Sequence, residues 1–360
     1  MTERLFAAEG PWLFSRGLDL LAFGGSTLAA WLLVALGAAL GIVDGDAPDW
    51  SWLACVVAVD VAHVWSTSFR VYLSRVELRE RPLLYLGLPA LAYLAGLALH
   101  AISALSFWRA LAYVALFHFV RQQAGFMALY ARRAAPAARL DALLDRAAIY
   151  AVMLFPILDW HARLPRRFAW FVAGDFVPWL AFGAPRALLP LAELAMFAVL
   201  ALFLLRQVVL ARRARVVPGK SLLVLSTFAC WYGGIVLFDS DYVFTVTNVL
   251  LHGVPYLLLT YRYARASGPA SLGRAIALRG AAPFLLVCMA LALGEETLWD
   301  RVVWHERAHL FGTSLDVPAA LLLFLAPLLA VPQLTHYLLD GFVWRVRSEN
   351  PVLRRELEEA

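Results

Sequence analysis

Ten long apolar runs, separated by short polar connections, constrain this chain more than any other feature of its sequence. Each run approaches the roughly 20 apolar residues with which an α-helix crosses the hydrocarbon core of a bilayer. The composition agrees, because 62% of the 360 residues are hydrophobic and only 16% are charged, whereas soluble domains have about 25% charged residues. We therefore predict an all-α, polytopic transmembrane helix bundle, a single domain over residues 1–360, with about ten spans near 20–43, 51–73, 82–102, 107–131, 144–163, 187–210, 220–238, 242–264, 276–294 and 317–344.

The Lys and Arg residues predict how these spans are oriented. Cytoplasmic loops of membrane proteins collect positive charge, and here every second connection is rich in Arg, whereas the intervening connections are mostly acidic or uncharged. This alternation predicts an integral protein of the bacterial inner (cytoplasmic) membrane with both termini in the cytoplasm. Segment 162–186 is an Arg-rich exception, which we interpret as a re-entrant or interfacial segment, and 295–316 is expected to be an extracytoplasmic amphipathic loop. Because loop ends explain the net charge of +5, nucleic acid is not an expected partner.

Four of the eight histidines lie well inside predicted spans, and all four of those spans are even-numbered, whereas His100 and His161 lie at span ends. They therefore run in the same direction across the membrane, from outside to inside. Each histidine precedes a cytoplasmic arginine by 7 to 14 residues. At about 1.5 Å per residue, the four imidazoles should lie within a slab roughly 10 Å deep in the inner half of the bilayer. One site could collect all four: His63, His118, His252 and His336.

Each of these histidines has a polar neighbour three or four residues away, on the same face of its helix. The pairs are Asp60 with His63, His118 with Gln122, Asn248 with His252, and His336 with Asp340. A metal-bound imidazole coordinates through one nitrogen and usually donates its other N–H to a carboxylate, amide or carbonyl. We therefore expect the four neighbours to orient the histidines, or to serve as alternative metal ligands.

The ligand type indicates the cofactor. Imidazole suits iron, copper and zinc, and four histidines leave open positions on a metal that prefers six ligands. Iron(II) that activates dioxygen is our first choice, with zinc, copper or haem as alternatives. A site buried in lipid predicts a membrane-soluble substrate such as an isoprenoid, carotenoid, sterol or acyl chain. Aromatic residues near the histidines, which could line its channel, are Trp65, Phe119, Tyr256 and Tyr337.

Four short segments resemble a known family. They are "AHVWST" with His63, "HFVRQQ" with His118, "LLHGVPYLLLTYR" with His252, and "HYLLDGFVWR" with His336 and Asp340. In these segments the chain is similar to the integral-membrane β-carotene dioxygenases of the bacteriorhodopsin-related-protein (Brp/Blh) type. That resemblance implies a polytopic helical protein that binds non-haem iron through histidines in several spans. It also implies an oxidative cleavage of β-carotene to retinal.

Other functions compete for the same residues. Residues 305–309 read "HERAH", the H-E-x-x-H pattern of zinc proteases, which would use His305 and His309 as ligands and Glu306 as a base. The motif precedes the tenth span, whereas Asp340 lies near the cytoplasmic end of that span, more than 20 helical residues and so about 30 Å away, so we expect no protease site that uses both. The four intramembrane histidines could instead hold haem, or serve proton-coupled transport.

Overall fold

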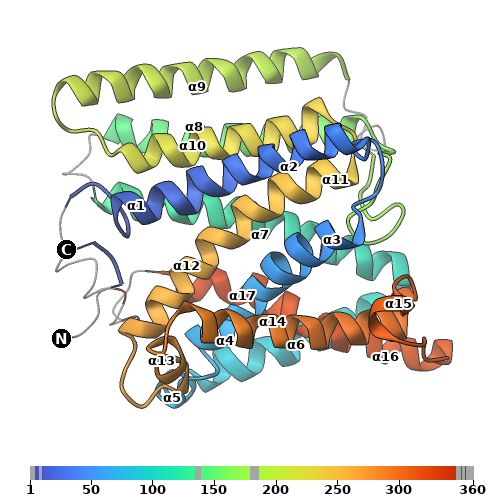
Figure 1. Cartoon of the computed structure of the whole chain (residues 1–360). Helices are drawn as coiled ribbons and strands as arrows, with labels where there is room; N and C mark the ends of the chain where they lie inside the picture. Colours follow the sequence, from blue (N-terminus) through green and yellow to red (C-terminus); the bar gives the residue numbers. More distant parts are fainter. Residues whose placement is uncertain are drawn as a thin grey trace.

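The computed structural model describes residues 5–7, 10–133, 139–178, 186–345, 350 and 353, and within those ranges the chain forms helices without any strand (Figure 1). A single β-bridge joins Ser74 and Ser271. Eight helices are long and apolar enough to cross a membrane, which confirms an all-helical protein of the integral-membrane class. They are Arg16–Leu40, Asp49–Arg70, Pro82–Ile102, Arg186–Arg212, Pro218–Leu237, Asp241–Ala266, Ala281–Trp304 and Ala319–Val343.

Two further long helices correspond to the other predicted spans. Helix α7 (Ala104–Arg133) and helix α8 (Arg139–Ala162) are as long as the eight but more polar. The polar residues of α7 include His118, Arg121 and Gln122, which face the interior or a groove described below. The lower hydropathy of α7 thus comes partly from the residues that build the candidate site.

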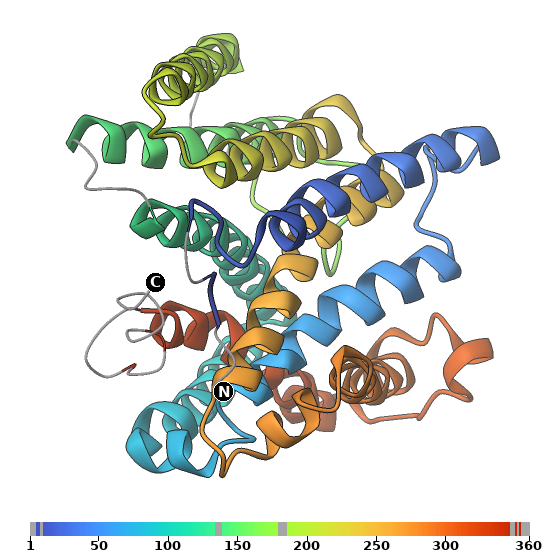
Figure 2. The ribbon, with the colours of Figure 1, turned by 60° about the vertical axis from the view of Figure 1, so that its left-hand side comes forward.

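The histidine-bearing helices occupy the middle of the bundle. They are α4 (Ala62–Arg70), α7, α12 (Leu250–Ala266) and α17 (Val331–Val343). On one side they are flanked by α2 (Ser26–Leu40), α8, α9 (Leu189–Arg212) and α10 (Pro218–Trp231), and on the other by α6 (Pro82–Ile102), α14 (Ala281–Trp299) and α16 (Ala319–Leu329) (Figures 1 and 2). Helix α4 packs against α12 and α17, and α7 packs against α12 and α17. This closed ring of contacts turns the four histidine faces towards one another.

Close backbone packing beside the site depends on one glycine. A Cβ atom on Gly253, next to His252, would lie 2.5 Å from Cγ1 of Val59 and 3.1 Å from the Val59 carbonyl oxygen. A side chain there would force Val59 to move, because real Cβ atoms essentially never lie as close as 2.5 Å to another atom and rarely as close as 3.1 Å. Gly253 therefore allows α12 to pack against the helical segment that leads into His63.

Two of the histidines follow stretches of π-helix. The π-helical segments Trp52–Val61 and Thr245–Val249 end shortly before His63 and His252. An extra residue per turn rotates the side chains that follow it relative to a continuous α-helix, and such turns recur at functional sites. The register of both histidines thus depends on local backbone geometry that a regular 3.6-residue pattern does not predict.

Segment 162–186 is not a helix where the structure describes it. Helix α8 ends at Ala162, residues 163–178 form turns and bends, and residues 179–185 lie outside the described ranges. The loop folds onto the bundle, where Trp170 contacts Phe119 at a ring-centroid distance of 5.7 Å. Burial raises the pKa of Asp175, which accepts hydrogen bonds from the backbone N–H groups of Trp170 and Phe171 at 2.9 and 2.8 Å. Residues 163–178 therefore form an aromatic loop that packs against the bundle.

The predicted loop over 295–316 starts too early. Helix α14 continues to Trp299 and is followed by a π-helical stretch, Asp300–Trp304, so the first ten residues of this segment belong to a span. Glu295 and Glu296 are buried. The Nε1 atoms of Trp65 and Trp299 donate to the Glu295 carboxylate at 2.6 and 3.2 Å, which offsets part of the cost of burying a charge.

Candidate metal centre

The structure brings all four predicted histidines together in the centre of the bundle. The ring centroid of His63 lies 4.6 Å from that of His252 and 4.8 Å from that of His336, and the ring of His118 lies 5.1 and 4.5 Å from the same two rings. Each of the four side chains is at most 2% exposed. Four imidazoles from four different helices therefore share one water-poor space.

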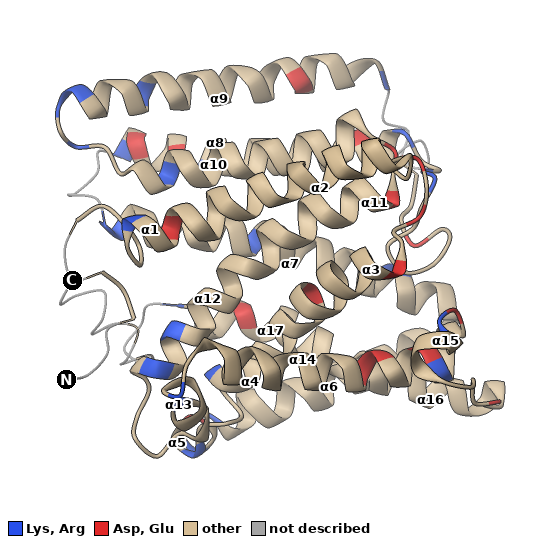
Figure 3. Ribbon diagram, in the orientation of Figure 1, with Lys and Arg blue, Asp and Glu red and all other residues tan. Residues whose placement is uncertain are grey.

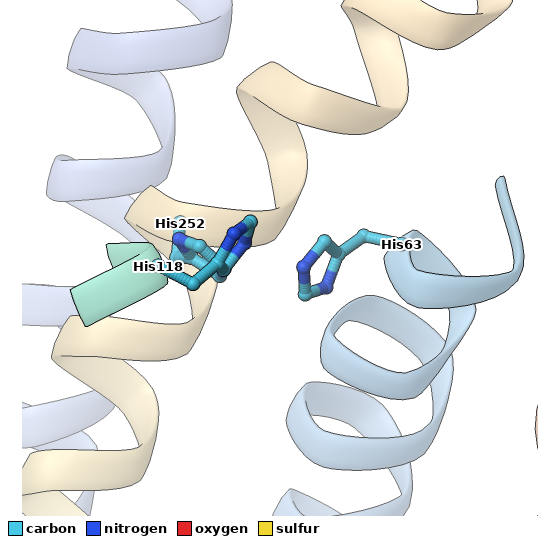
Figure 4. Close-up of side chains that lie close together, drawn as sticks. All are labelled: His63, His118 and His252. Atoms are coloured by element: carbon cyan, nitrogen blue, oxygen red, sulfur yellow. The ribbon is translucent and has the colours of Figure 1, made fainter. Parts of the chain in front are cut away.

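The nitrogens of three of these rings already have the spacing of a ligand set. One ring nitrogen from each of His63, His118 and His252 lies within 4.8 Å of the other two, and Figure 4 shows the three rings turned towards one another. The Nε2 atom of His336 faces Nε2 of His118 at 3.0 Å. Two imidazoles bound to one metal at about 2.0–2.1 Å place their nitrogens about 3–3.4 Å apart. His336 thus lies within ligand-pair distance of one member of the triad, His118.

The hydrogen bonds of the cluster are incomplete without a further group. Both ring nitrogens of His63 and both of His252 are buried and have no hydrogen-bond partner. Leaving a buried donor or acceptor unpaired destabilises a fold by about 1–3 kcal/mol. Four such atoms in one cluster are therefore unusual unless the cluster binds a further group. A metal ion is bound by neutral imidazole nitrogens, and the residues present therefore fit one.

The orienting partners differ from those predicted by helical spacing. Asp340 was expected to serve His336, but its Oδ2 lies 3.6 Å from Nδ1 of His118 on another helix. The Nδ1 atom of His336 instead contacts the Thr67 hydroxyl at 2.7 Å. Asp60 does approach its predicted partner, with Oδ1 at 3.5 Å from Nδ1 of His63, beyond good hydrogen-bond geometry. Neither Arg70 nor Arg121 forms an ion pair with Asp340 among the described residues.

The two predicted amide partners have other roles. Gln122 donates from Nε2 to the backbone carbonyl of His252 at 2.7 Å, which fixes α7 against α12 at the level of the cluster. Asn248 does not contact the ring of His252. It donates instead to the Phe244 carbonyl at 3.2 Å and to the Thr247 hydroxyl at 3.1 Å, so it stabilises the π-helical stretch.

Aromatic rings surround the cluster, and two of the four that the sequence indicated line its larger cavity. Tyr256 and Tyr337 border a space of about 1060 Å³ that reaches His118 and Asp340. Trp65 borders a separate space of about 320 Å³ on the side of His336. Phe119 lines neither cavity, because its ring stacks on that of His252 at 3.7 Å and 8°. Phe119 therefore packs against the imidazole of His252 and does not line either of these two cavities.

The sequence reasoning missed two residues of the site. Thr67 lies four residues after His63 and bonds His336 from the neighbouring helix, and nothing in the sequence marks that long-range contact. Arg121 lies three residues after His118 and therefore on nearly the same helical face, where it lines the larger cavity. Its position inside a span was a signal that could have identified it, since intramembrane charges are usually functional.

The zinc-protease motif does not form a site. His305 ends the π-helical stretch in a left-handed conformation with φ of 59°, and the next helix, α15, covers only Ala308–Phe311. His305 and His309 are thus not on one continuous helix. The Nε2 atom of His309 contacts Asp49 at 2.7 Å, and Glu306 pairs with Arg307 at 3.2 Å. The motif therefore serves surface ion pairs on the side of the bundle away from Asp340.

The fold and the cluster define a class: an all-helical membrane protein with a buried four-histidine centre. No family model matches the chain, and no curated protein or solved structure is significantly similar to it. The function must therefore be argued from the site alone.

Proposed function

We propose that this chain is an integral-membrane, metal-dependent oxidoreductase that acts on a lipid-soluble hydrocarbon such as a carotenoid or another isoprenoid. The observation that carries this proposal is the convergence of His63, His118, His252 and His336. Both ring nitrogens of His63 and of His252 are buried without a hydrogen-bond partner. All-imidazole ligation suits iron, copper and zinc. Iron is our first choice, because four ligands leave positions open, where bound iron(II) would supply dioxygen activation.

The protein groups around the cluster have distinct tasks in this proposal. Thr67 contacts Nδ1 of His336 at 2.7 Å and so aims its Nε2 into the shared space. Asp340 lies 3.6 Å from Nδ1 of His118, and this distance would shorten to a hydrogen bond when His118 binds the metal. Phe119 and Tyr256 cover the rings of His252 and His336 and exclude water. The cavity beside His118 would hold the hydrocarbon against the centre. A dry, apolar site of this kind protects reactive intermediates from water.

Haem is the alternative that the same histidines could serve. A porphyrin would have to lie flat between two facing imidazoles. The rings of His118 and His336 are in edge contact, with their Nε2 atoms 3.0 Å apart, so the arrangement leaves no plane for one. This spacing favours a single ion over haem.

Metal analysis of the detergent-purified protein tests the proposal. We expect about one equivalent of a transition metal, with iron predominant after anaerobic purification, and no Soret absorption band. A Soret band would establish haem instead. Protein that stays fully folded with only trace iron, copper and zinc, even after metal is added back, would contradict the oxidoreductase and leave proton-coupled transport as the function of the histidines.

We further propose ten spans, with α7 and α8 included, both termini in the cytoplasm, and residence in a bacterial inner membrane. The distribution of charge supports this orientation. Most Lys and Arg gather at the end of the bundle with α5 (Arg75–Glu80) and α13 (Leu272–Ala277), whereas acidic residues are frequent at the end with α11 (Asp241–Phe244) and α15 (Figure 3). The basic end would face the cytoplasm.

Reporter fusions test this orientation. An enzyme active only in the periplasm, fused after Arg213, is expected to be inactive, and the same enzyme fused after Asp241 is expected to be active, because α10 should carry the chain across the membrane between them. Equal activity at both positions would show that α10 does not cross and would put the histidines at different depths.

A further inference from the structure

The cavity beside the histidine cluster is a long groove along α7. It has a volume of about 1060 Å³, and α8, α12 and α17 form its other walls. Its lining extends along α7 from Tyr113 to Arg132, which is about 28 Å at the rise of an α-helix. His118 and Asp340 lie in its wall. The groove therefore passes directly by the candidate metal centre.

Arg121 is an exposed cation in the lining of this groove. Its Nη1 atom donates to the Tyr150 hydroxyl at 2.6 Å, and no carboxylate of the described residues lies within ion-pair distance of it. Arg70 differs, since it is buried in the same bundle but pairs with Glu77 at 3.0 Å. A lone charge inside the hydrocarbon region is unfavourable and usually marks a functional site. An anionic group of a ligand would neutralise it.

The groove combines this cation with apolar walls and a basic mouth. Between Arg121 and Arg132 its lining includes Gly125, Leu129 and Leu259, and a Cβ atom on Gly125 would meet nothing within 4 Å. Arg132 and Arg345 line the end that we assign to the cytoplasmic surface. Arginines at the mouth, an apolar passage and a single inner arginine complement a molecule with one acid group and a long apolar chain.

We propose that the groove binds a long-chain carboxylic acid, with its carboxylate on the guanidinium of Arg121 and its chain extending past His118 towards Tyr113. A guanidinium holds a carboxylate through two parallel hydrogen bonds. That this acid is the substrate of the metal centre rests on the proposed function, but its binding does not. The carbons nearest the acid group then lie beside the histidines, because Arg121 is only about 4.5 Å from His118 along the helix axis.

The depth of Arg121 in the groove favours a fatty acid over a phospholipid as the ligand. Arg121 lies 11 residues before Arg132, which places it about 16 Å deeper along the helix. A phospholipid phosphate stays at the interface, near Arg132 and Arg345. A single-chain acid has no second chain or large head group to hold it there, so it can enter the groove as far as Arg121.

Binding of radiolabelled palmitate to detergent-purified protein tests the proposal. Arg121→Gln is expected to weaken palmitate binding by about 10- to 100-fold, the usual scale for losing a hydrogen-bonded charge partner. Arg146→Gln is the matched control, because Arg146 is an exposed α8 residue outside the groove, and it should bind palmitate like the wild type. Gly125→Leu should also reduce binding by filling the groove, whereas Gly87→Leu, at an equally open glycine on α6, should not.

A comparison of two ligands on the wild-type protein tests the proposal without relying on any variant to fold. Methyl palmitate lacks the charge and should bind at least about 10-fold more weakly than palmitate. The proposal would be overturned if the wild type bound palmitate and its methyl ester equally well, or if folded Arg121→Gln bound palmitate as well as the wild type does. Binding of phosphatidylglycerol that depends on Arg121, without any binding of palmitate, would also overturn it. Metal content measured on the same samples separates the two proposals: palmitate binding without metal contradicts the oxidoreductase, and metal without palmitate binding contradicts the groove assignment.

Discussion

Replacing His63 with leucine is expected to reduce the bound metal from about one equivalent to background. Leucine is similar in volume to histidine, so packing among α4, α12 and α17 should survive while one of four ligands is lost. His63 faces the rings of both His252 and His336, and one of its ring nitrogens belongs to the triad with His118 and His252. Metal content by mass spectrometry, measured on monodisperse protein, gives the result.

A graded comparison distinguishes ligands from residues that only orient them. Asp340→Asn is expected to weaken metal binding by about 10- to 100-fold, the usual effect of losing a partner that fixes a metal-bound imidazole. His100→Leu is the control, because His100 lies at the end of α6, outside the cluster, and should keep full metal content. Full occupancy in folded His63→Leu protein would contradict a centre that includes His63.

The histidines could be predicted because their positions follow from helix geometry alone. Span length and the direction of each helix place His63, His118, His252 and His336 at similar depths, and depth does not depend on which helices are neighbours. Their burial also agrees with the cost of exposing imidazoles and carboxylates to lipid. The structure adds that the four imidazoles converge in one space, which the sequence could only suggest.

The orienting partners could not be predicted in the same way. Spacing along one helix pairs His336 with Asp340, but the space between helices is decided by packing that no single sequence pattern contains. In the structure Asp340 reaches across to His118, and Thr67 takes the position beside His336. The close contact at Gly253 is a further example, because only the approach of Val59 shows why a side chain is disfavoured there.

Helix α14 extends beyond its predicted end, at a point where charged residues are buried. The sequence predicts a loop from residue 295, but Glu295 and Glu296 lie inside helix α14 and are buried. Two indole N–H groups bond the carboxylate of Glu295 inside the bundle, and the helix therefore continues for about ten residues. The sequence alone does not show whether a carboxylate is hydrogen-bonded inside the protein or exposed to water, so this helix end could not be predicted.

Arg70 is expected to be essential for stability and dispensable for metal binding. It is fully buried and pairs with Glu77 at 3.0 Å, donates to Asn350 and to the Val343 carbonyl at 2.9 and 3.1 Å, and lies over the ring of Tyr263. These contacts join α4 to the end of α17. Arg70→Met should therefore cost about 3 kcal/mol, the lower end of the range for breaking a buried ion pair, because Glu77 is 16% exposed and keeps the hydrogen bonds that Tyr85 and Tyr263 donate to it.

Such a loss should lower the melting temperature by at least about 6 °C, since each kcal/mol shifts the midpoint of a large domain by about 2–4 °C. The double variant with Glu77→Gln should recover part of it, because the uncompensated carboxylate is then gone. Metal content per folded molecule should stay at the wild-type value in both variants. Arg70→Met protein that melts like the wild type but has lost its metal would place Arg70 in the metal centre itself. The polar residues of segment 60–70, "DVAHVWSTSFR", would then all belong to the metal centre, and Arg70 would not form a separate structural cluster beside it.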